Sequence, residues 1–306
     1  MNRRLHRLKI HLLVEVAMFC FLIPATIYAT SLQDIRQNGV LRHLGVPYAH
    51  FVRHTNTGVD GLDVEMMQLF AKHLGVRYEY VETSWKDVFG DVTGNLTQVS
   101  GDDVMTIGTT RVKGDIVANG LTVLPDRQKR VDYSIPVFPT GVWVMARADS
   151  PIKPIAPTGD IGKDIEQVKE LLKGHSVLSM KGTCLDPDLY DLNSTGADIH
   201  YHTSSQFLGD IAQKVVNGEA EITLLDIPDA LIALQKWPEE VKIIGPISAR
   251  QVMGIAVAKD SPELLNEYNR FFRTCWEDGT YKRLVEKYYP AVFLYFGDFF
   301  KNSLGE

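Results

Sequence analysis

Cysteine is scarce in this chain of 306 residues, which contains 3. Cys20 lies in an apolar stretch near the N-terminus, so only Cys184 and Cys275 remain in the rest of the chain. These two could pair in an oxidising compartment, but nothing in the sequence places them close together. We expect two unpaired thiols.

Motifs that hold metals or drive catalysis are also missing. The nine histidines are scattered, without HExxH or CxxC spacing, which argues against a metal site. There is no GxSxG nucleophile motif and no phosphate-binding P-loop. We therefore expect no metal, no cofactor and no enzyme activity.

Positive charge is not in excess. The chain has 32 Lys and Arg against 38 Asp and Glu, which gives a formal net charge of −6. A mildly acidic chain of mixed charge lacks the basic surface that nucleic acid requires. We expect no nucleic-acid partner.

One long apolar run is present, and it lies at the N-terminus. Four basic residues precede an apolar run over 10–23, which Glu15 interrupts and Pro24 ends. A small residue, Ala29, follows where a signal peptidase would cut. We predict a signal peptide over 1–29, removal of which moves the net charge from −6 to −9. The protein is then periplasmic. An uncleaved anchor is the alternative, because Glu15 is unusual in such a run.

Strand and helix patterns alternate along the rest of the chain, which predicts an α/β protein with mainly parallel sheets. Residues 90–113 are polar and rich in glycine and predict a loop, and Gly182-Thr183-Cys184 predicts the start of a helix. The remaining pattern predicts strands over 40–46, 76–81, 138–146, 176–180, 221–225, 241–244 and 253–258, and helices over 63–74, 165–172, 207–217, 226–235, 261–276 and 280–289.

Residues 114–134 suggest a site for a small anion. A short strand at 116–117 leads into a corner of small residues at 119–122. Such a corner leaves backbone N–H groups and the Thr122 hydroxyl free to donate hydrogen bonds. Arg127 follows closely, and its planar fork of donors fits a carboxylate. An ordinary strand–turn–strand with a surface arginine is the alternative.

Several short segments occur in a recognisable order. Together they resemble the family 3 periplasmic solute-binding proteins, best known as amino-acid receptors of ABC importers, over about residues 38–290. The segments are Gly61-Leu62-Asp63-Val64-Glu65, Trp85-Lys86-Asp87-Val88, Thr122 to Ser134, Lys181-Gly182-Thr183, Gly218-Glu219-Ala220-Glu221 ahead of Asp226, and Asp278-Gly279-Thr280-Tyr281.

The resemblance implies a type II periplasmic binding protein fold. Two α/β lobes, each a mainly parallel sheet flanked by helices, would hold the ligand in the cleft between them. Lobe 1 would span 31–138 plus 248–306, and lobe 2 would span 139–247. The lobes would close around the ligand at hinges near 139–142 and 245–248.

The resemblance also implies which residues bind the ligand. Arg127 would clamp its carboxylate, helped by Thr122 and the backbone near Gly120. Thr183 and Cys184 would offer a helix N-terminus to the same anion. Asp226 would bind the ammonium group of the ligand.

The remaining implied site residues would shape specificity. Tyr48 and Trp85 would flank the ligand side chain, and Asn119 stands where the family often has serine. Tyr48 and Trp85 also suit core packing, and Asp226 also suits helix capping.

Three functions fit the resemblance. The first is a monomeric receptor that binds an amino acid or related carboxylate and passes it to a membrane permease. The second is a sensory module for a membrane signalling protein. The third is a periplasmic dehydratase of prephenate-like acids. The aromatic tail over 288–300 is expected to pack on lobe 1, with a docking surface as the alternative.

Overall fold

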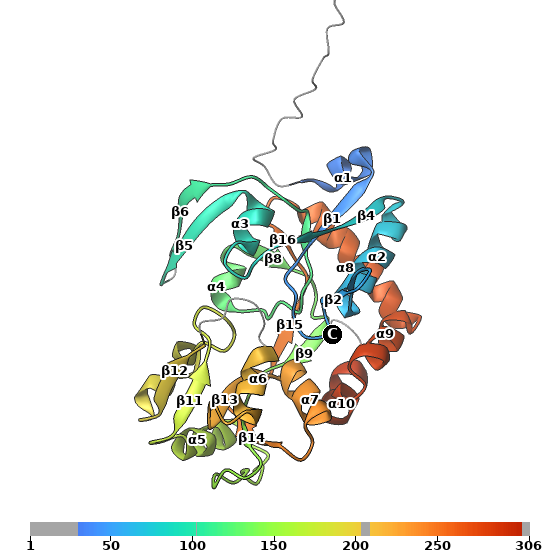
Figure 1. Ribbon diagram of the computed structural model, residues 1–306. Coiled ribbons are helices and arrows are strands. Elements are labelled where there is room, and N and C mark those ends of the chain that lie inside the picture. The colour runs from blue at the N-terminus through green and yellow to red at the C-terminus, as the bar shows by residue number, and fades with distance from the viewer. Residues whose placement is uncertain (1–29, 102, 203–208, 302–306) are drawn as a thin grey trace, which may run out of the picture.

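Two five-stranded sheets form the framework of the protein in this computed structural model, which describes residues 30–101, 103–202 and 209–301 (Figure 1). The strand orders are β4-β1-β7-β16-β8 and β12-β11-β13-β10-β14. We call the parts built on these sheets lobe 1 and lobe 2. The predicted signal peptide over 1–29 lies outside the described residues.

Lobe 1 is built around β1 (Val40–Gly45), which pairs in parallel with β4 (Arg77–Glu82) and β7 (Ile116–Val117). β16 (Ala256–Ala258) runs antiparallel to β7 and to β8 (Val131–Tyr133). The helices of this lobe are α1 (Leu32–Asn38), α2 (Leu62–Leu74), α3 (Val88–Thr93), α4 (Pro125–Gln128), α8 (Pro262–Glu277) and α9 (Thr280–Tyr288).

Lobe 2 is built around β13 (Ile222–Asp226), which is parallel to β11 (Ser176–Ser179) and antiparallel to β10 (Val142–Arg147). β12 (Asp198–Tyr201) and β14 (Val241–Pro246) complete this sheet. Its helices are α5 (Ile161–Leu171), α6 (Gly209–Val216) and α7 (Ile227–Lys236), with short 3₁₀ helices η1 (Pro187–Tyr190) and η2 (Leu192–Ser194).

Each sheet is mainly parallel, because four of its five strands point the same way and one runs against them. Every antiparallel pairing within the two five-stranded sheets involves β10 or β16. These are the strands with which the chain enters a lobe after crossing from the other one. They run against their neighbours because the chain arrives from the side where the neighbouring strands end.

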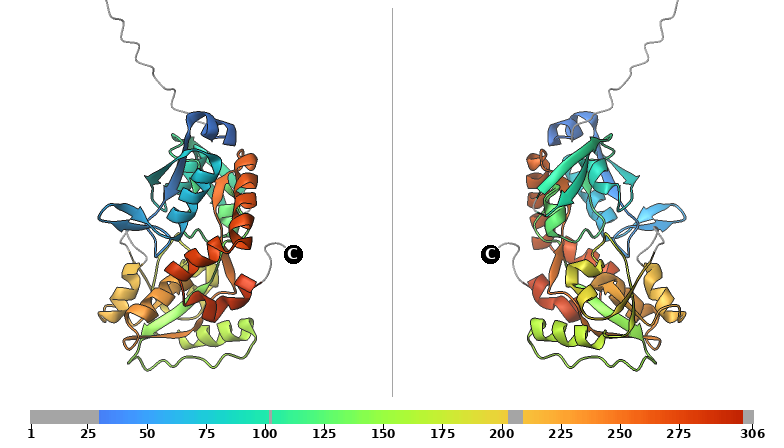
Figure 2. Two further views of the ribbon diagram at one scale, coloured as in Figure 1. Left: turned by 90° about the vertical axis from the view of Figure 1, so that its right-hand side faces the viewer. Right: turned by 90° about the vertical axis from the view of Figure 1, so that its left-hand side faces the viewer.

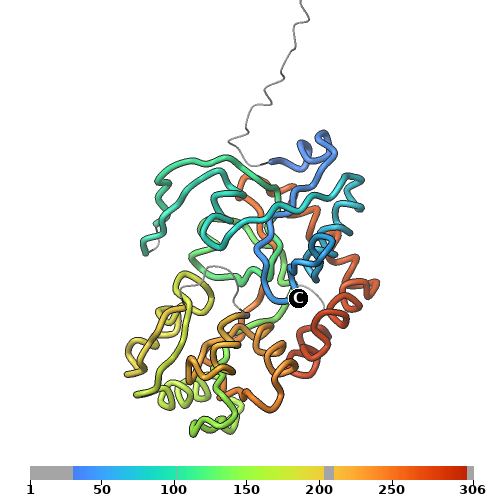
Figure 3. The backbone as a smooth tube through the Cα atoms, viewed as in Figure 1, coloured from blue at the N-terminus to red at the C-terminus, as the bar shows by residue number. Residues whose placement is uncertain are grey.

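The chain crosses between the lobes on two short strands, β9 (Phe138–Thr140) and β15 (Gln251–Met253), which pair with each other outside both sheets (Figure 3). The strands predicted over 138–146 and 253–258 are therefore each two strands. The breaks fall at Gly141 and at Gly254-Ile255. At Gly141 a Cβ atom would meet the Ser248 hydroxyl at 3.2 Å, so the second crossing segment packs closely against the first.

Residues 90–113 do not form the predicted loop. They contain the end of α3 and a two-stranded hairpin of β5 (Asn95–Ser100) and β6 (Asp103–Thr109). Leucine, valine, isoleucine and threonine alternate with polar residues in this stretch, a pattern that favours extended backbone despite the low hydrophobicity. A second small hairpin joins β2 (Arg53–Thr55) and β3 (Gly58–Asp60).

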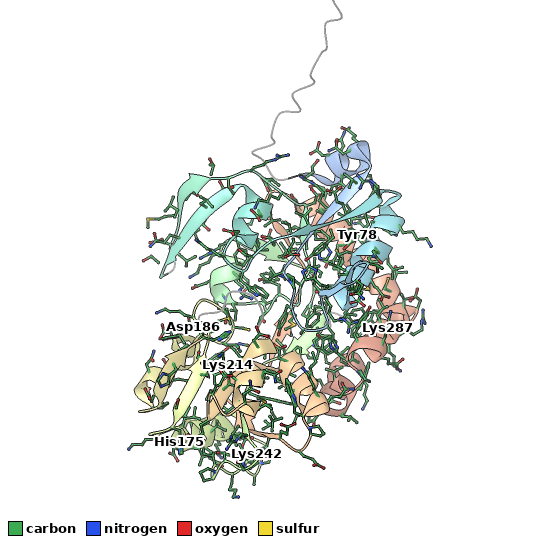
Figure 4. The ribbon with its side chains drawn as sticks, in the orientation of Figure 1. Tyr78, His175, Asp186, Lys214, Lys242 and Lys287 are labelled. Atoms are coloured by element: carbon green, nitrogen blue, oxygen red, sulfur yellow. The ribbon has the colours of Figure 1, made fainter. Side chains whose placement is uncertain are left out.

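Helices flank both sheets, and the last of them, α10 (Val292–Lys301), lies beside the junction of the lobes (Figure 2). Lys287 on α9, labelled in Figure 4, forms an ion pair with Glu65 on α2 and so ties the helices of lobe 1 together. None of the helices in the described residues is long and apolar enough to cross a membrane.

The aromatic tail packs on both lobes, not on lobe 1 alone. Phe296 and Tyr295 of α10 lie against Trp143 of β10 in lobe 2, with ring centroids 6.4 and 5.5 Å apart. Phe300 of the same helix stacks on Trp276 of α8 in lobe 1, at 5.9 Å. The tail therefore bridges the two lobes on the side of α8.

We expect Phe296→Ala to destabilise the protein by about 3 kcal/mol, because it removes a buried ring from the contact between α10 and lobe 2. Leu294→Ala in the same helix is the matched control, since Leu294 is 84% exposed. Urea denaturation of both variants measures the effect. Equal midpoints would contradict a structural role for the α10 contact.

Candidate functional site

The corner that follows β7 is held by two buried side chains. His43 donates from Nε2 to the Ala118 carbonyl oxygen at 2.5 Å, and Asp63 accepts the Gly120 N–H at 2.7 Å. Gly120 has φ of 64°, and a Cβ atom there would lie 2.4 Å from the Phe51 ring, so only glycine fits. The Gly120 N–H that we expected to be free for a ligand is thus already used.

Both supporting side chains have shifted pKa values. Burial lowers the pKa of His43 to about 4, so its ring is neutral near pH 7. Burial raises the pKa of the Asp63 carboxyl to about 7, and the hydrogen bond from Gly120 opposes that shift. The corner therefore rests on one neutral imidazole and on one carboxyl that ionises near neutral pH.

Arg127 lies in the short helix α4, beside this corner. Its guanidinium donates to the Thr122 carbonyl oxygen at 3.0 Å and lies over the Trp85 ring at 5.7 Å. The side chain is only 9% exposed, and among the described residues no carboxylate lies within ion-pair distance of it. Thr122 thus contacts Arg127 through its backbone and not through its hydroxyl.

A row of contacts leads from Arg127 into lobe 2. The Trp85 ring meets the edge of the Tyr48 ring at 5.8 Å. Tyr48 then donates to Asp226 Oδ2 at 3.0 Å. Arg127, Trp85, Tyr48 and Asp226 therefore lie in one place, although they are far apart in the sequence.

Asp226 ends β13 and caps α7, and it is only 1% exposed. Its Oδ1 accepts hydrogen bonds from Thr140 and from the Ile227 N–H, and its Oδ2 accepts from Tyr48 and from the Cys184 thiol at 3.4 Å. Burial raises the pKa of Asp226, and these hydrogen bonds oppose the shift. Four donors fill about all the acceptor positions that a carboxylate has.

Thr183 and Cys184 do not begin a helix, contrary to our expectation. The segment after β11 forms turns, and the short η1 starts only at Pro187. The Thr183 hydroxyl donates to the Met180 carbonyl oxygen at 2.9 Å and accepts the Leu185 N–H at 3.0 Å. Because the turn uses its own polar groups, this segment offers no helix dipole to an anion.

The Cys184 thiol is buried against Asp226. Burial first, and then the Asp226 charge, raise the pKa of Cys184 well above its ordinary value, so the thiol stays protonated. Cys184 and Cys275 are both free, as expected, and both are buried.

Five residues have buried side-chain atoms with no hydrogen-bond partner in the part of the chain that the structure describes. The atoms belong to the Asn119 amide, Arg130 Nε, His202 Nε2, Asp229 Oδ2 and Gln251 Oε1. Asn119 was expected at the site, whereas Asp229 and Gln251 were missed. The spacing of Asp229, three residues after Asp226 and about one helical turn away, is the signal that could have found it.

The two mixed α/β lobes and their paired crossing strands define a type II periplasmic binding protein fold. The model of the bacterial extracellular solute-binding proteins, family 3, matches residues 43–291. The chain therefore belongs to this family, as the sequence indicated.

Curated relatives of this chain include two kinds of protein. Membrane-bound lytic murein transglycosylase F of Desulfosudis oleivorans is 26% identical over 86% of this chain and 51% of the relative. L-cystine-binding protein TcyJ of Escherichia coli is 26% identical over 76% of this chain and 74% of the relative. The chain thus spans about half the length of the transglycosylase relatives that it matches.

Solved structures with the same fold include amino-acid-binding proteins. A mutant of ArgBP from T. maritima has a TM-score of 0.66 and 22% identity, and covers 85% of this chain and 100% of its own. The ancestral amino-acid-binding protein AncCDT-1, a precursor of cyclohexadienyl dehydratase, has a TM-score of 0.65 and 26% identity. It covers 84% of this chain and 99% of its own.

We expect Asp63→Asn to stabilise the protein relative to wild type, increasingly so as the pH rises from about 4 to 7. The folded Asp63 carboxyl keeps its proton up to a pKa of about 7, whereas the unfolded one loses it near its ordinary pKa of about 3.9. The wild type therefore loses stability across this window, and asparagine, which does not ionise, removes that loss. Urea denaturation at several pH values measures the difference. A difference that is constant with pH would contradict this account.

Proposed function

We propose that the protein is an extracytoplasmic receptor that captures a small amino acid or related carboxylate between its lobes and delivers it to an ABC-type permease. The buried Arg127 guanidinium, with no ion-pair partner among the described residues, is the observation that carries this proposal. A buried, unpaired cation has lost its hydration without gaining a counter-ion, which raises the free energy of the folded protein. A ligand carboxylate supplies the counter-ion and lowers that free energy.

The acids of lobe 2 supply the opposite charge. Asp226 and Asp229 are buried at the start of α7, and Tyr48 of lobe 1 contacts Asp226 directly. A ligand with a carboxylate at one end and an ammonium at the other satisfies Arg127 and this acidic end together. Amino acids are zwitterions of this kind.

The closed arrangement of the lobes agrees with capture by closure. The hydrogen bond from Tyr48 to Asp226 joins the lobes at the site, and the chain crosses between them on only two short strands. Domain closure of this kind uses a few residues in the connecting segments as hinges. The expected hinges near 139–142 and 245–248 fall in or beside these segments.

The named relatives support an amino-acid ligand and an extracytoplasmic site of action. L-cystine-binding protein TcyJ and ArgBP bear the names of amino acids that they bind, and the family description is extracellular. The N-terminal pattern of four basic residues and an apolar run agrees with export to the periplasm. A sensory role with the same ligand is the second candidate.

A thermal-shift screen over the twenty standard amino acids, L-cystine, dicarboxylates and aromatic acids tests the proposal. A ligand at a hundredfold excess over its Kd adds about 2.7 kcal/mol of stability, which shifts the melting temperature measurably. No shift with any amino acid or carboxylate would refute it. If the liganded protein stimulates ATP hydrolysis by a permease, that result would support transport over sensing.

We expect Arg127→Ala to weaken binding of the amino acid found in this screen by about 3–5 kcal/mol, because the ligand carboxylate is left buried without its cation. Isothermal titration calorimetry measures the loss. Arg130→Ala is the matched control, since Arg130 is three residues further on and lies over Phe89 rather than Trp85. Unchanged affinity for the Arg127 variant would refute the assignment.

A further inference from the structure

The helix α10 (Val292–Lys301) begins where the region matched by the family ends. The family model matches residues 43–291, and α10 starts at the next residue. Residues 289–291 join it to α9 of lobe 1, so it is tethered closely to that lobe. A helix outside the matched region gives this chain contacts between the lobes that the family fold does not require.

The two halves of α10 pack on different lobes. The helix is interrupted at Phe296, whose φ of −131° and ψ of 30° are not helical. At and before this break, Phe296 and Tyr295 lie against Trp143 of lobe 2. Beyond it, Phe300 stacks on Trp276 of lobe 1, with ring centroids 5.9 Å apart. The helix therefore spans the junction, with one contact on each side.

The same helix contacts both segments on which the chain crosses between the lobes. The ring of Phe300 lies 6.3 Å from that of Phe138 in β9. The guanidinium of Arg250, which immediately precedes β15, lies 5.7 Å from the centroid of the Phe296 ring. Trp143 is the second residue of β10, directly after the first crossing. A rotation of lobe 2 about these segments therefore changes how Trp143 meets α10.

The contact of α10 with lobe 1 is the firmer of its two contacts. Phe293 and Phe300, on either side of the break, lie 4.6 Å apart and so fix the angle between the two halves. On the other side, the Tyr295 residue is 49% exposed, and a cavity of about 470 Å³ is lined by Tyr295, Trp143 and residues of β14. When the lobes separate, α10 therefore stays on lobe 1, and its contact with lobe 2 is the one that breaks.

We propose that α10 is a strap that favours the closed arrangement of the two lobes. A helix bent at a fixed angle fits both Trp143 and Trp276 in one relative orientation of the lobes. In that orientation Tyr48 of lobe 1 also donates to Asp226 of lobe 2 across the site. The strap and the site contact therefore stabilise the same arrangement, and loss of the strap contact shifts the population toward open lobes.

The strap acts on the lobes themselves and not on the residues that line the site. The larger the fraction of the protein that is already closed, the less free energy a solute must supply to close it. Apparent affinity rises with that fraction, whichever solute the site takes. The inference therefore goes beyond the proposed function and does not depend on it.

A distance measured between spin labels on the two lobes tests the inference in the intact protein without added solute. Lys86 of lobe 1 follows Trp85, and Lys181 of lobe 2 lies two residues before Thr183, so the two exposed lysines flank the site. Spin labels attached to a Lys86→Cys, Lys181→Cys variant report this distance by double electron–electron resonance. The chain without added cysteines is the labelling control, because both of its cysteines in the described residues are buried.

We expect Tyr295→Ala, in this labelled background, to raise the ratio of long to short label distances about tenfold. The reason is that one aromatic pair contributes up to about this factor to an equilibrium. Trp143→Ala removes the same contact from the side of lobe 2 and is expected to raise the ratio at least as much. Two controls are expected to match the unchanged strap: Tyr295→Phe, which keeps the ring, and Leu294→Ala, since Leu294 is 84% exposed.

Label distances that stay the same in both the Tyr295→Ala and the Trp143→Ala variant would overturn the inference. Shorter distances in these variants would also overturn it, because they would mean that α10 holds the lobes apart. The double variant is a further check, since two rings that act as one contact give effects that do not add. Full additivity would contradict the strap. None of these results depends on whether the protein binds an amino acid.

Discussion

A buried guanidinium without a protein counter-ion is the constraint on which the site depends. Arg127 uses one donor on the Thr122 carbonyl oxygen and presents its face to Trp85, and among the described residues it has no acid partner. The surrounding corner is rigid, because Gly120, Asp63 and His43 fix its backbone. The Thr122 and Trp85 contacts thus position the guanidinium, and in the proposed function its counter-ion is the carboxylate of the ligand.

Asp226 and Asp229, the two buried acids at the start of α7, differ in the hydrogen bonds that the protein supplies to them. Asp226 is satisfied by protein donors from both lobes, and so it orders the walls of the site and joins the lobes. Asp229 is left with an open oxygen in the same buried region. The two carboxyls therefore have different hydrogen-bond partners, although they are only three residues apart.

The sequence predicted the elements of the fold well, but not the way in which some of them pair. Apolar spacing gave α2 and its stop at Gly75, and the alternation of strands and helices gave the α/β class. It did not give the hairpin of β5 and β6, because those strands are mostly exposed and lack a buried face. It predicted mainly parallel sheets but did not identify β10 and β16 as the strands that run the other way, since their direction is set by how the chain crosses between lobes.

The sequence by itself determined the family and the two-lobed class, because ordered motifs are local patterns, and its strand–corner–arginine segment led to the proposal that Arg127 is the binding cation. Only the tertiary structure decided which polar groups remain open for a ligand. The Gly120 N–H, the Thr183 hydroxyl and Asp226 all find partners within the protein, while Asn119 and Asp229 keep unpaired atoms. The partners of a buried polar group come from distant parts of the chain, so the local sequence does not show whether the group is hydrogen-bonded.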